Sequence, residues 1–199
     1  MRPRVVIETV MVSGAAASRS SWAALFGYAA LVYGSLPWTR DVLVALGQHH
    51  AVGLLVTASY FGAAALIVYH VVFDVRLTDR AAFVALVVLG AGVGALVLGL
   101  SIPEERMHFL QYGLMAVLAR RAVAPYLGPW AHYIAAVVLS ALLGLGDELI
   151  QGLLPDRHYD TRDVLINAVA AALAMVGYEL LHNRLGLRSP PPTAGADPS

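Results

Sequence analysis

The chain has 199 residues, of which 59% are hydrophobic and 13% charged, and its formal net charge is zero. Soluble domains carry about a quarter charged residues, so this composition, with a mean hydropathy of +0.70, indicates one domain embedded in a membrane. A net charge of zero gives no electrostatic reason to expect a nucleic-acid partner. Because the chain has no cysteine, disulfides, iron–sulfur clusters and thiol catalysis are excluded.

The first 20 residues are predicted to form an N-terminal cytoplasmic tail. Their apolar run is short and is interrupted by Glu8, whereas a secretory signal needs a longer apolar region. At the other end, residues 186–199 are rich in proline and are predicted to be disordered. Between the two tails, residues 21–185 are predicted to form one transmembrane helical domain.

Six apolar segments divide this domain into predicted spans, because a spanning helix needs about 20 mainly apolar residues, within about 17 to 25. The segments lie at residues 21–38, 51–73, 81–102, 107–124, 130–151 and 162–183. The fourth is the weakest, since Arg120 and Arg121 interrupt it and Pro125 ends it. We expect it to begin at Glu104 or Glu105, with the arginines reaching the membrane surface. The predicted fold class is therefore all-α, a polytopic transmembrane bundle of about six spans.

The arginine distribution predicts the orientation of this bundle. With six spans, the two tails and the loops at 74–80 and 120–128 share one side and carry nine arginines, whereas the other side carries four. Because cytoplasmic loops are enriched in basic residues, both termini are expected in the cytoplasm. The connections at 103–108 and 152–162 are then expected to face the outside together.

Small residues indicate close helix packing in three segments. Gly90 and Gly94 have the spacing that lets helix backbones approach each other. Gly144 and the alanine-rich part of the sixth segment are expected to act in the same way. Tight packing within the chain explains the pattern, and a dimerisation face is the alternative.

Polar side chains gather near the predicted outer end of the fourth segment. Glu104 or Glu105, His108 and Tyr112 lie three and four residues apart, so they share one face of a helix. An ionisable residue in or beside a membrane span marks a candidate functional site, because burial away from water is costly unless the group is paired.

The fifth and sixth segments carry matching polar pairs at the same predicted end. Glu148 and Gln151 are three residues apart and share a face of the fifth segment, whereas Asp147 is expected to point about 100° away. Asp163 and Asn167 are four apart on the sixth segment. Three helices could therefore converge on one polar cluster that is open to the outer leaflet.

The cluster has the residue types that acid–base chemistry needs. A carboxylate beside a histidine can exchange protons with a substrate, so Glu148, His108 and Asp163 are the candidate catalytic residues. The same three side chains could bind a divalent metal. No spacing matches a zinc motif such as H-E-x-x-H, so no metal is assigned and the cofactor is left unknown.

Purely structural roles are the alternatives. Asp160 followed three residues later by Asp163 is typical of a helix N-cap with its N3 acid. Asn167 lies two turns into an apolar helix, where an interhelical hydrogen bond is the expected partner.

The other polar groups of the cluster have structural alternatives as well. Glu148 and Gln151 could pair with Arg157 or Arg162 to close the loop between the last two segments. His108 could be a helix-end residue that donates a hydrogen bond to Glu104.

The motifs ERMHFLQYGL and DELIQGLLPDRHYDTRDVLIN resemble the VanZ-like family of bacterial membrane proteins over about residues 100–180. That family has a D-K-x-x-H-x-x-x-Y type motif, then E-x-x-Q, a loop arginine, and D-x-x-x-N at the start of the last helix. The acid–lysine pair is Glu104-Glu105 in this chain, and the basic charge is displaced to Arg106. The residues that match are His108, Tyr112, Glu148, Gln151, Arg157, Asp163 and Asn167.

The resemblance implies a multi-pass protein of the bacterial cytoplasmic membrane and cell envelope. The family is named for an accessory protein linked to resistance to the glycopeptide teicoplanin, and glycopeptides act on cell-wall precursors outside the membrane. We therefore expect binding or modification of a lipid or lipid-linked glycan headgroup at the outer leaflet. Arg157 and Arg106 would hold an anionic group, and Gln151, Tyr112 and Asn167 complete the predicted binding residues.

Two other functions stay open. The chain could be a non-catalytic accessory subunit of a larger membrane protein complex, with the polar cluster serving only to lock the bundle. A small transporter or channel would have polar residues at mid-membrane and internal repeats, and neither is seen in the sequence.

Overall fold

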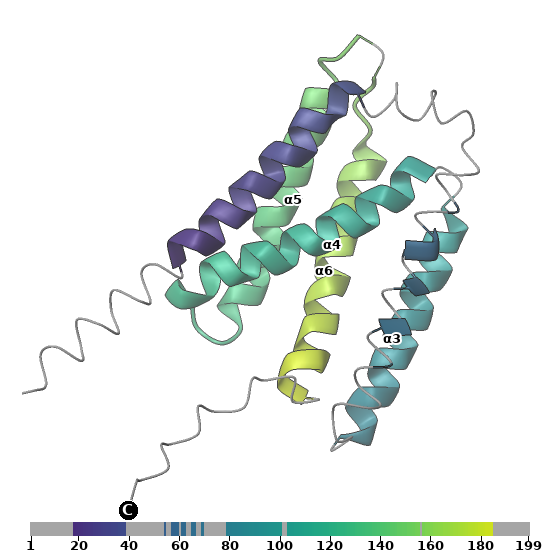
Figure 1. The fold of residues 1–199 in the computed structure, drawn as a ribbon, viewed down its shortest axis with the longest axis vertical. Coiled ribbons are helices and arrows are strands. Elements are labelled where there is room, and N and C mark those ends of the chain that lie inside the picture. Colours follow the sequence, from purple (N-terminus) through teal and green to yellow (C-terminus); the bar gives the residue numbers. More distant parts are fainter. Residues whose placement is uncertain are drawn as a thin grey trace, which may run out of the picture.

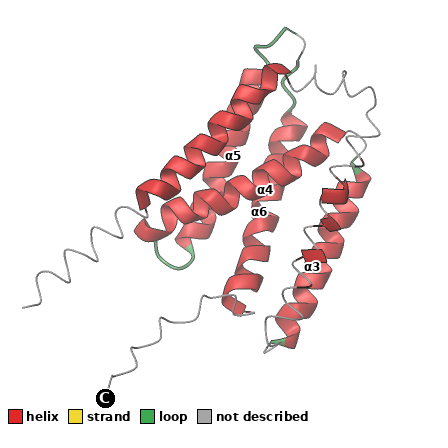
Figure 2. Cartoon of the chain, viewed as in Figure 1, coloured by secondary structure: helices red, strands yellow, loops and turns green. Residues whose placement is uncertain are grey.

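The computed structural model describes residues 18–38, 79–100, 103–155 and 157–184, with scattered residues between 54 and 69. All regular structure in these ranges is helical and none of these residues is in a strand (Figure 2), so the predicted all-α fold class is confirmed. The predicted second span at 51–73 falls mostly outside the described residues. Nearly all of the N-terminal tail and the whole C-terminal tail also lie outside them.

Besides the scattered helical residues between 54 and 69, the described chain consists of five helices and two short helical turns. A helix over residues 18–38 comes first and begins three residues before the predicted segment. The other elements are α3 (Arg80–Gly99), α4 (Pro103–Val123), the 3₁₀ turn η1 (Ala124–Tyr126), α5 (Ala131–Gln151), α6 (Thr161–Glu179) and the π-helical turn η2 (Leu180–Arg184).

Local sequence explains where these helices begin and end. Asp79 caps α3 by accepting a hydrogen bond of 3.0 Å from the Ala82 amide, the role that aspartate fills at helix N-termini. The fourth helix begins at Pro103, close to its predicted start, and Pro125 lies in the 3₁₀ turn that follows it. Proline has no amide hydrogen to continue an α-helix.

Three of the described helices are long and apolar enough to cross a membrane: Arg80–Gly99, Ala131–Gln151 and Thr161–Asn183. Neither the helix over residues 18–38 nor α4, which carries charged residues at both ends, is one of them. These spans indicate a membrane protein. Six spans and cytoplasmic termini stay predictions.

The core lies where α4, α5 and α6 pack against one another, with the helix over residues 18–38 alongside α5 (Figure 1). Leu25, Ala29, Val32 and Leu36 are buried on that first helix and form one stripe at helical spacing. From α4, Tyr112 and Met115 are fully buried in the same core. The α3 helix lies to one side, where it contacts α6 and η2 (Figure 1).

Gly144 permits the closest approach between α5 and α6. A Cβ atom added there would lie 2.9 Å from both Cβ and Nδ2 of Asn167, a distance at which something must shift. The predicted packing role of Gly144 is confirmed. At Gly90 and Gly94, by contrast, no described residue lies within 4 Å of an added Cβ, so the close approach predicted there is not found in the described part of the chain.

Gly146 makes room for the first helix in a similar way. The Tyr33 hydroxyl lies 2.8 Å from the position of a Cβ on Gly146 and donates a 2.5 Å hydrogen bond to the carbonyl oxygen of Leu143. This contact holds the helix over residues 18–38 against the end of α5 that carries Glu148. The first helix thereby becomes one wall of the site described below.

Candidate functional site

The start of α4, the end of α5 and the start of α6 converge on a group of buried polar side chains. Burying so many polar groups together is costly unless each finds a partner or a ligand. Side chains less than a tenth exposed in this region are Glu105, His108, Asp147, Glu148, Gln151 and Asn167. We call these six, with Arg157 and Asp163, the polar cluster. The predicted convergence of three helix ends is therefore present in the structure.

His108 and Asn167 join α4 to α6 through a hydrogen bond of 3.1 Å between His108 Nδ1 and Asn167 Oδ1. An amide oxygen can only accept, so Nδ1–H of His108 is the donor in this hydrogen bond. The interhelical partner predicted for Asn167 is confirmed. The alternative in which His108 donates to Glu104 involves a side chain that lies outside the described residues.

Glu148 ties the end of α5 to the loop that follows it. Its Oε1 accepts a 3.0 Å hydrogen bond from the Gln151 amide group, and its Oε2 accepts one of 3.1 Å from the backbone N–H of Asp160. The alternative prediction, in which Glu148 pairs with Arg157 or Arg162, is not found among the described contacts. A side-chain amide and a backbone amide hold this carboxylate instead.

Asp160 is the N-cap of α6, as predicted, and accepts a 2.7 Å hydrogen bond from the Arg162 amide. In a reciprocal capping box, the N3 acid would accept the N–H of the cap residue. Here Glu148 accepts that N–H. Asp163, at N3, is therefore available to the polar cluster, and its Oδ1 is buried with no hydrogen-bond partner among the described residues.

Asp147 belongs to the polar cluster, which corrects the prediction that it points away. Its carboxylate is only 1% exposed, and Oδ2 accepts a 2.8 Å hydrogen bond from the Tyr112 hydroxyl of α4. Its Oδ1 is buried and accepts no hydrogen bond from a described residue. One signal in the sequence could have revealed it, because Asp147 and Gln151 are four residues apart and share a helix face.

A cavity of about 30 Å³ lies beside these groups. Its polar walls come from His108, Gln111, Asp147, Gln151 and Arg157, and its remaining walls from Val32, Ser35, Leu36 and Met107. This volume is about the share of one water molecule in liquid water. The cavity can hold a water molecule or an ion, but it cannot hold a sugar ring.

The two arginines predicted to hold an anion have different surroundings. Arg157 lines the cavity and interacts electrostatically with Asp147. Arg106 donates from Nε and Nη2 to the carbonyl oxygen of Leu100, at 3.0 and 2.7 Å, and from Nη1 to Thr57. Arg106 thus satisfies a carbonyl group just beyond the end of α3, and the structure does not bring it into the polar cluster.

A further ion pair borders the cluster. Arg162 Nη1 lies 2.7 Å from Oε1 of Glu105, whose side chain is 3% exposed, whereas that of Arg162 is 57% exposed. Sequence spacing left Glu104 and Glu105 as alternatives. Glu105 lies beside the cluster, and the side chain of Glu104 is outside the described residues. The pairing of Glu105 with Arg162 links the starts of α4 and α6.

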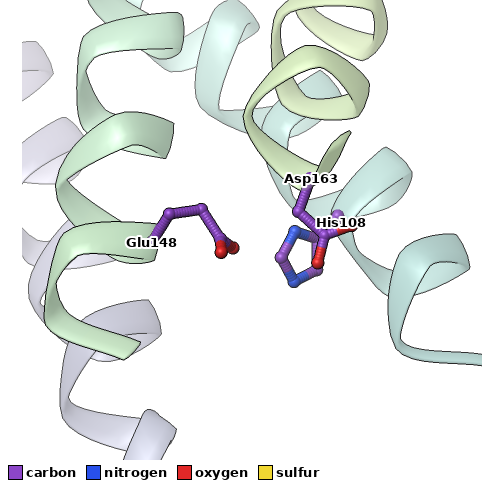
Figure 3. Close-up of side chains that lie close together, drawn as sticks. All are labelled: His108, Glu148 and Asp163. Atoms are coloured by element: carbon purple, nitrogen blue, oxygen red, sulfur yellow. The ribbon is translucent and has the colours of Figure 1, made fainter. Parts of the chain in front are cut away.

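The three candidate catalytic residues come from three different helices and meet. His108, Glu148 and Asp163 each offer a ligand atom, and these atoms all lie within 4.8 Å of one another. Figure 3 shows Glu148 extending from α5 toward the imidazole ring and toward Asp163. Two carboxylates around an imidazole can exchange protons with a bound molecule or ligate a cation.

A family model described as VanZ/LLP1 matches residues 22–182, which is most of the chain. No curated protein and no solved structure is significantly similar to the chain. The resemblance over residues 100–180 is confirmed, and the match extends through the first helix as well. With its three apolar helices of spanning length, the chain is a membrane protein that belongs to the VanZ/LLP1 family.

Proposed function

We propose that this protein binds an anionic headgroup of a lipid or lipid-linked glycan at the outer leaflet of the bacterial cytoplasmic membrane and modifies it with the polar cluster. The observation that carries the proposal is the placement of Arg157 beside His108 and Asp147 in one cavity wall. A guanidinium group donates pairs of hydrogen bonds to phosphate or carboxylate oxygens. Arg157 is the residue that would receive the headgroup.

Unsatisfied groups favour a ligand over a purely structural role. The atoms Asp147 Oδ1, Arg157 Nε and Asp163 Oδ1 are buried without hydrogen-bond partners among the described residues. A buried polar atom left unpaired costs about 1–3 kcal/mol. A cluster that served only to lock the bundle would gain stability by satisfying these atoms, whereas a binding site keeps them for its ligand.

The cavity size limits how the headgroup would bind. Because about 30 Å³ holds a water molecule or an ion, the headgroup would stay at the mouth, where Arg157 holds its anionic group. His108, which lines the cavity, would then exchange a proton with the group that faces the cavity. Glu148, whose carboxylate lies within 4.8 Å of a ring nitrogen of His108, would exchange that proton with the imidazole in turn. Gln151 and Asn167 would orient Glu148 and His108 through the hydrogen bonds already formed.

Native mass spectrometry of the protein purified gently from its own membranes tests this proposal. The wild type should retain a specific anionic lipid or lipid-linked sugar, and Arg157→Gln should lose it. Arg106→Gln is the matched control, because it removes the same charge from an arginine outside the cluster. Equal retention by the wild type and Arg157→Gln would contradict the proposal.

One observation favours a second candidate function, a non-catalytic subunit of a larger membrane protein complex. Both carboxylate oxygens of Glu148 already accept hydrogen bonds from within the chain. This is the arrangement expected of a residue with a structural role. In this case Glu148→Gln should lower stability or assembly without changing the lipids retained. A stoichiometric protein partner that survives purification would support the subunit function.

A further inference from the structure

We propose that His108, Glu148 and Asp163 form a binding site for one divalent transition-metal ion. The three residues come from α4, α5 and α6, and their ligand atoms lie within 4.8 Å of one another (Figure 3). The inference rests on the same cluster as the proposed function, but metal binding requires no headgroup. The two can therefore fail independently.

The ligand set fits a first-row transition metal. Imidazole suits Zn²⁺ and Fe²⁺, carboxylates suit Mn²⁺, and all three of these ions accept a mixture of nitrogen and oxygen ligands. Three protein ligands that leave one position open are the usual arrangement of a catalytic zinc ion. Mg²⁺ binds through oxygen atoms and keeps several waters, so it should compete poorly for a site that includes an imidazole.

Two of the three side chains, His108 and Glu148, have the hydrogen-bond partners that metal ligands usually have. A histidine that binds a metal usually donates its second ring N–H to an oxygen, and carboxylate ligands are themselves hydrogen-bonded. His108 donates Nδ1–H to Asn167, which leaves Nε2 for the ion. Glu148 accepts one hydrogen bond at each oxygen, and each oxygen keeps a second lone pair.

Charge supplies an independent argument. Five carboxylates gather here with two guanidinium groups: those of Glu105, Asp147, Glu148, Asp160 and Asp163. Arg162 pairs with Glu105 and also acts on Asp163, and Arg157 acts on Asp147. With all five carboxylates ionised and His108 neutral, the region has a formal charge of −3, which one divalent cation lowers to −1. Buried charges that lack counter-ions are strongly unfavourable.

The cavity lined by His108, one of the three ligands, supplies a second observation. Asp147 Oδ1 is buried and has no hydrogen-bond partner in the part of the chain that the structure describes, and Asp147 lines the cavity together with His108. The volume of about 30 Å³ has room for a water molecule on the open position of the ion. Asp147 would then accept a hydrogen bond from that water.

Binding requires a small contraction of the site. Two ligand atoms bound to one Zn²⁺ at about 2.1 Å lie no more than about 4.2 Å apart. In the structure, the ligand atoms of the three residues lie within 4.8 Å of one another. Rotation of the Asp163 side chain can close this gap, because it is less buried than His108 and Glu148 and its Oδ1 has no hydrogen-bond partner among the described residues. The helices themselves need not move.

The test measures metal binding by the full-length protein in detergent, without added lipid. After treatment with a chelator, Zn²⁺ and Mn²⁺ are titrated by competition with a fluorescent chelator, and the bound metal is counted by mass spectrometry. Glu148→Gln and Asp163→Asn each remove one ligand charge. Asp160→Asn is the matched control, because it removes a neighbouring charge from a residue outside the ligand set while asparagine still caps the helix.

The wild type and Asp160→Asn should bind one ion each, and the two ligand variants should bind at least tenfold more weakly. In Mn²⁺-loaded wild type, pulsed electron paramagnetic resonance should detect coupling to one imidazole nitrogen, a readout that does not depend on how the variants fold. No bound ion in the wild type, or affinity equal to that of Asp163→Asn, would overturn the proposal. An Arg157→Gln variant that binds metal but no lipid would separate this site from the headgroup function.

Discussion

Replacing Gly144 by alanine tests the packing that brings Asn167 to His108. The added methyl carbon would lie 2.9 Å from Asn167 Cβ and Nδ2 and 3.2 Å from its Cγ. The amide group could rotate away, but the Cβ atom can move only if the backbone of α6 moves. Overpacking of this kind costs about 1–3 kcal/mol, whereas glycine to alanine in a helix gains about 1 kcal/mol. The net effect should therefore lie between neutral and about 2 kcal/mol of destabilisation.

Gly113→Ala is the matched control for this prediction. Its added Cβ would lie 3.7 Å from Ala174 Cβ, an ordinary contact, so the helix-propensity gain of about 1 kcal/mol should appear alone. The two variants should differ in stability by about 1–3 kcal/mol, measured by denaturant unfolding in detergent with far-ultraviolet circular dichroism. The reasoning is refuted if Gly144→Ala is as stable as Gly113→Ala.

Three further substitutions follow from single contacts. Tyr112→Phe removes the donor to buried Asp147 Oδ2 and should destabilise the fold by about 1–3 kcal/mol, measured in the same unfolding assay; unchanged stability would contradict this. Arg162→Gln alone should lower the free energy of unfolding by more than the double variant Arg162→Gln with Glu105→Gln, because the single change leaves the buried Glu105 carboxylate without this cation. A double variant less stable than Arg162→Gln alone would refute this prediction. Arg106→Gln should speed hydrogen exchange around Leu100, and unchanged exchange would argue against this capping contact.

Helical spacing was enough to predict most of the polar cluster. His108 with Tyr112, Glu148 with Gln151, and Asp163 with Asn167 were placed on common faces by separations of three or four residues. The structure brings members of all three pairs together. The cap at Asp160 was also predictable, because N-caps are set by local sequence.

Contacts between helices were harder to predict, because spacing fixes direction only within one helix. Asp147 was missed since its partner, Tyr112, belongs to another helix. Arg106 was misplaced because its acceptor is a backbone carbonyl group, that of Leu100, and side-chain patterns carry no signal for backbone acceptors. The same limit explains why the close approach predicted at both Gly144 and Gly90 is found only at Gly144. The two glycines look alike in sequence, but only Gly144 has a described residue of another helix within 4 Å of an added Cβ.

The central claim is that Arg157, beside the polar cluster, receives an anionic headgroup. The most direct measurement is the affinity of the purified protein for short-chain phosphatidylglycerol and phosphatidylcholine, compared between the wild type, Arg157→Gln and Arg106→Gln. The account predicts that the wild type and Arg106→Gln prefer the anionic lipid by at least about tenfold, roughly 1.4 kcal/mol, and that Arg157→Gln loses this preference. The same preference in all three proteins, or none in the wild type, would contradict the claim.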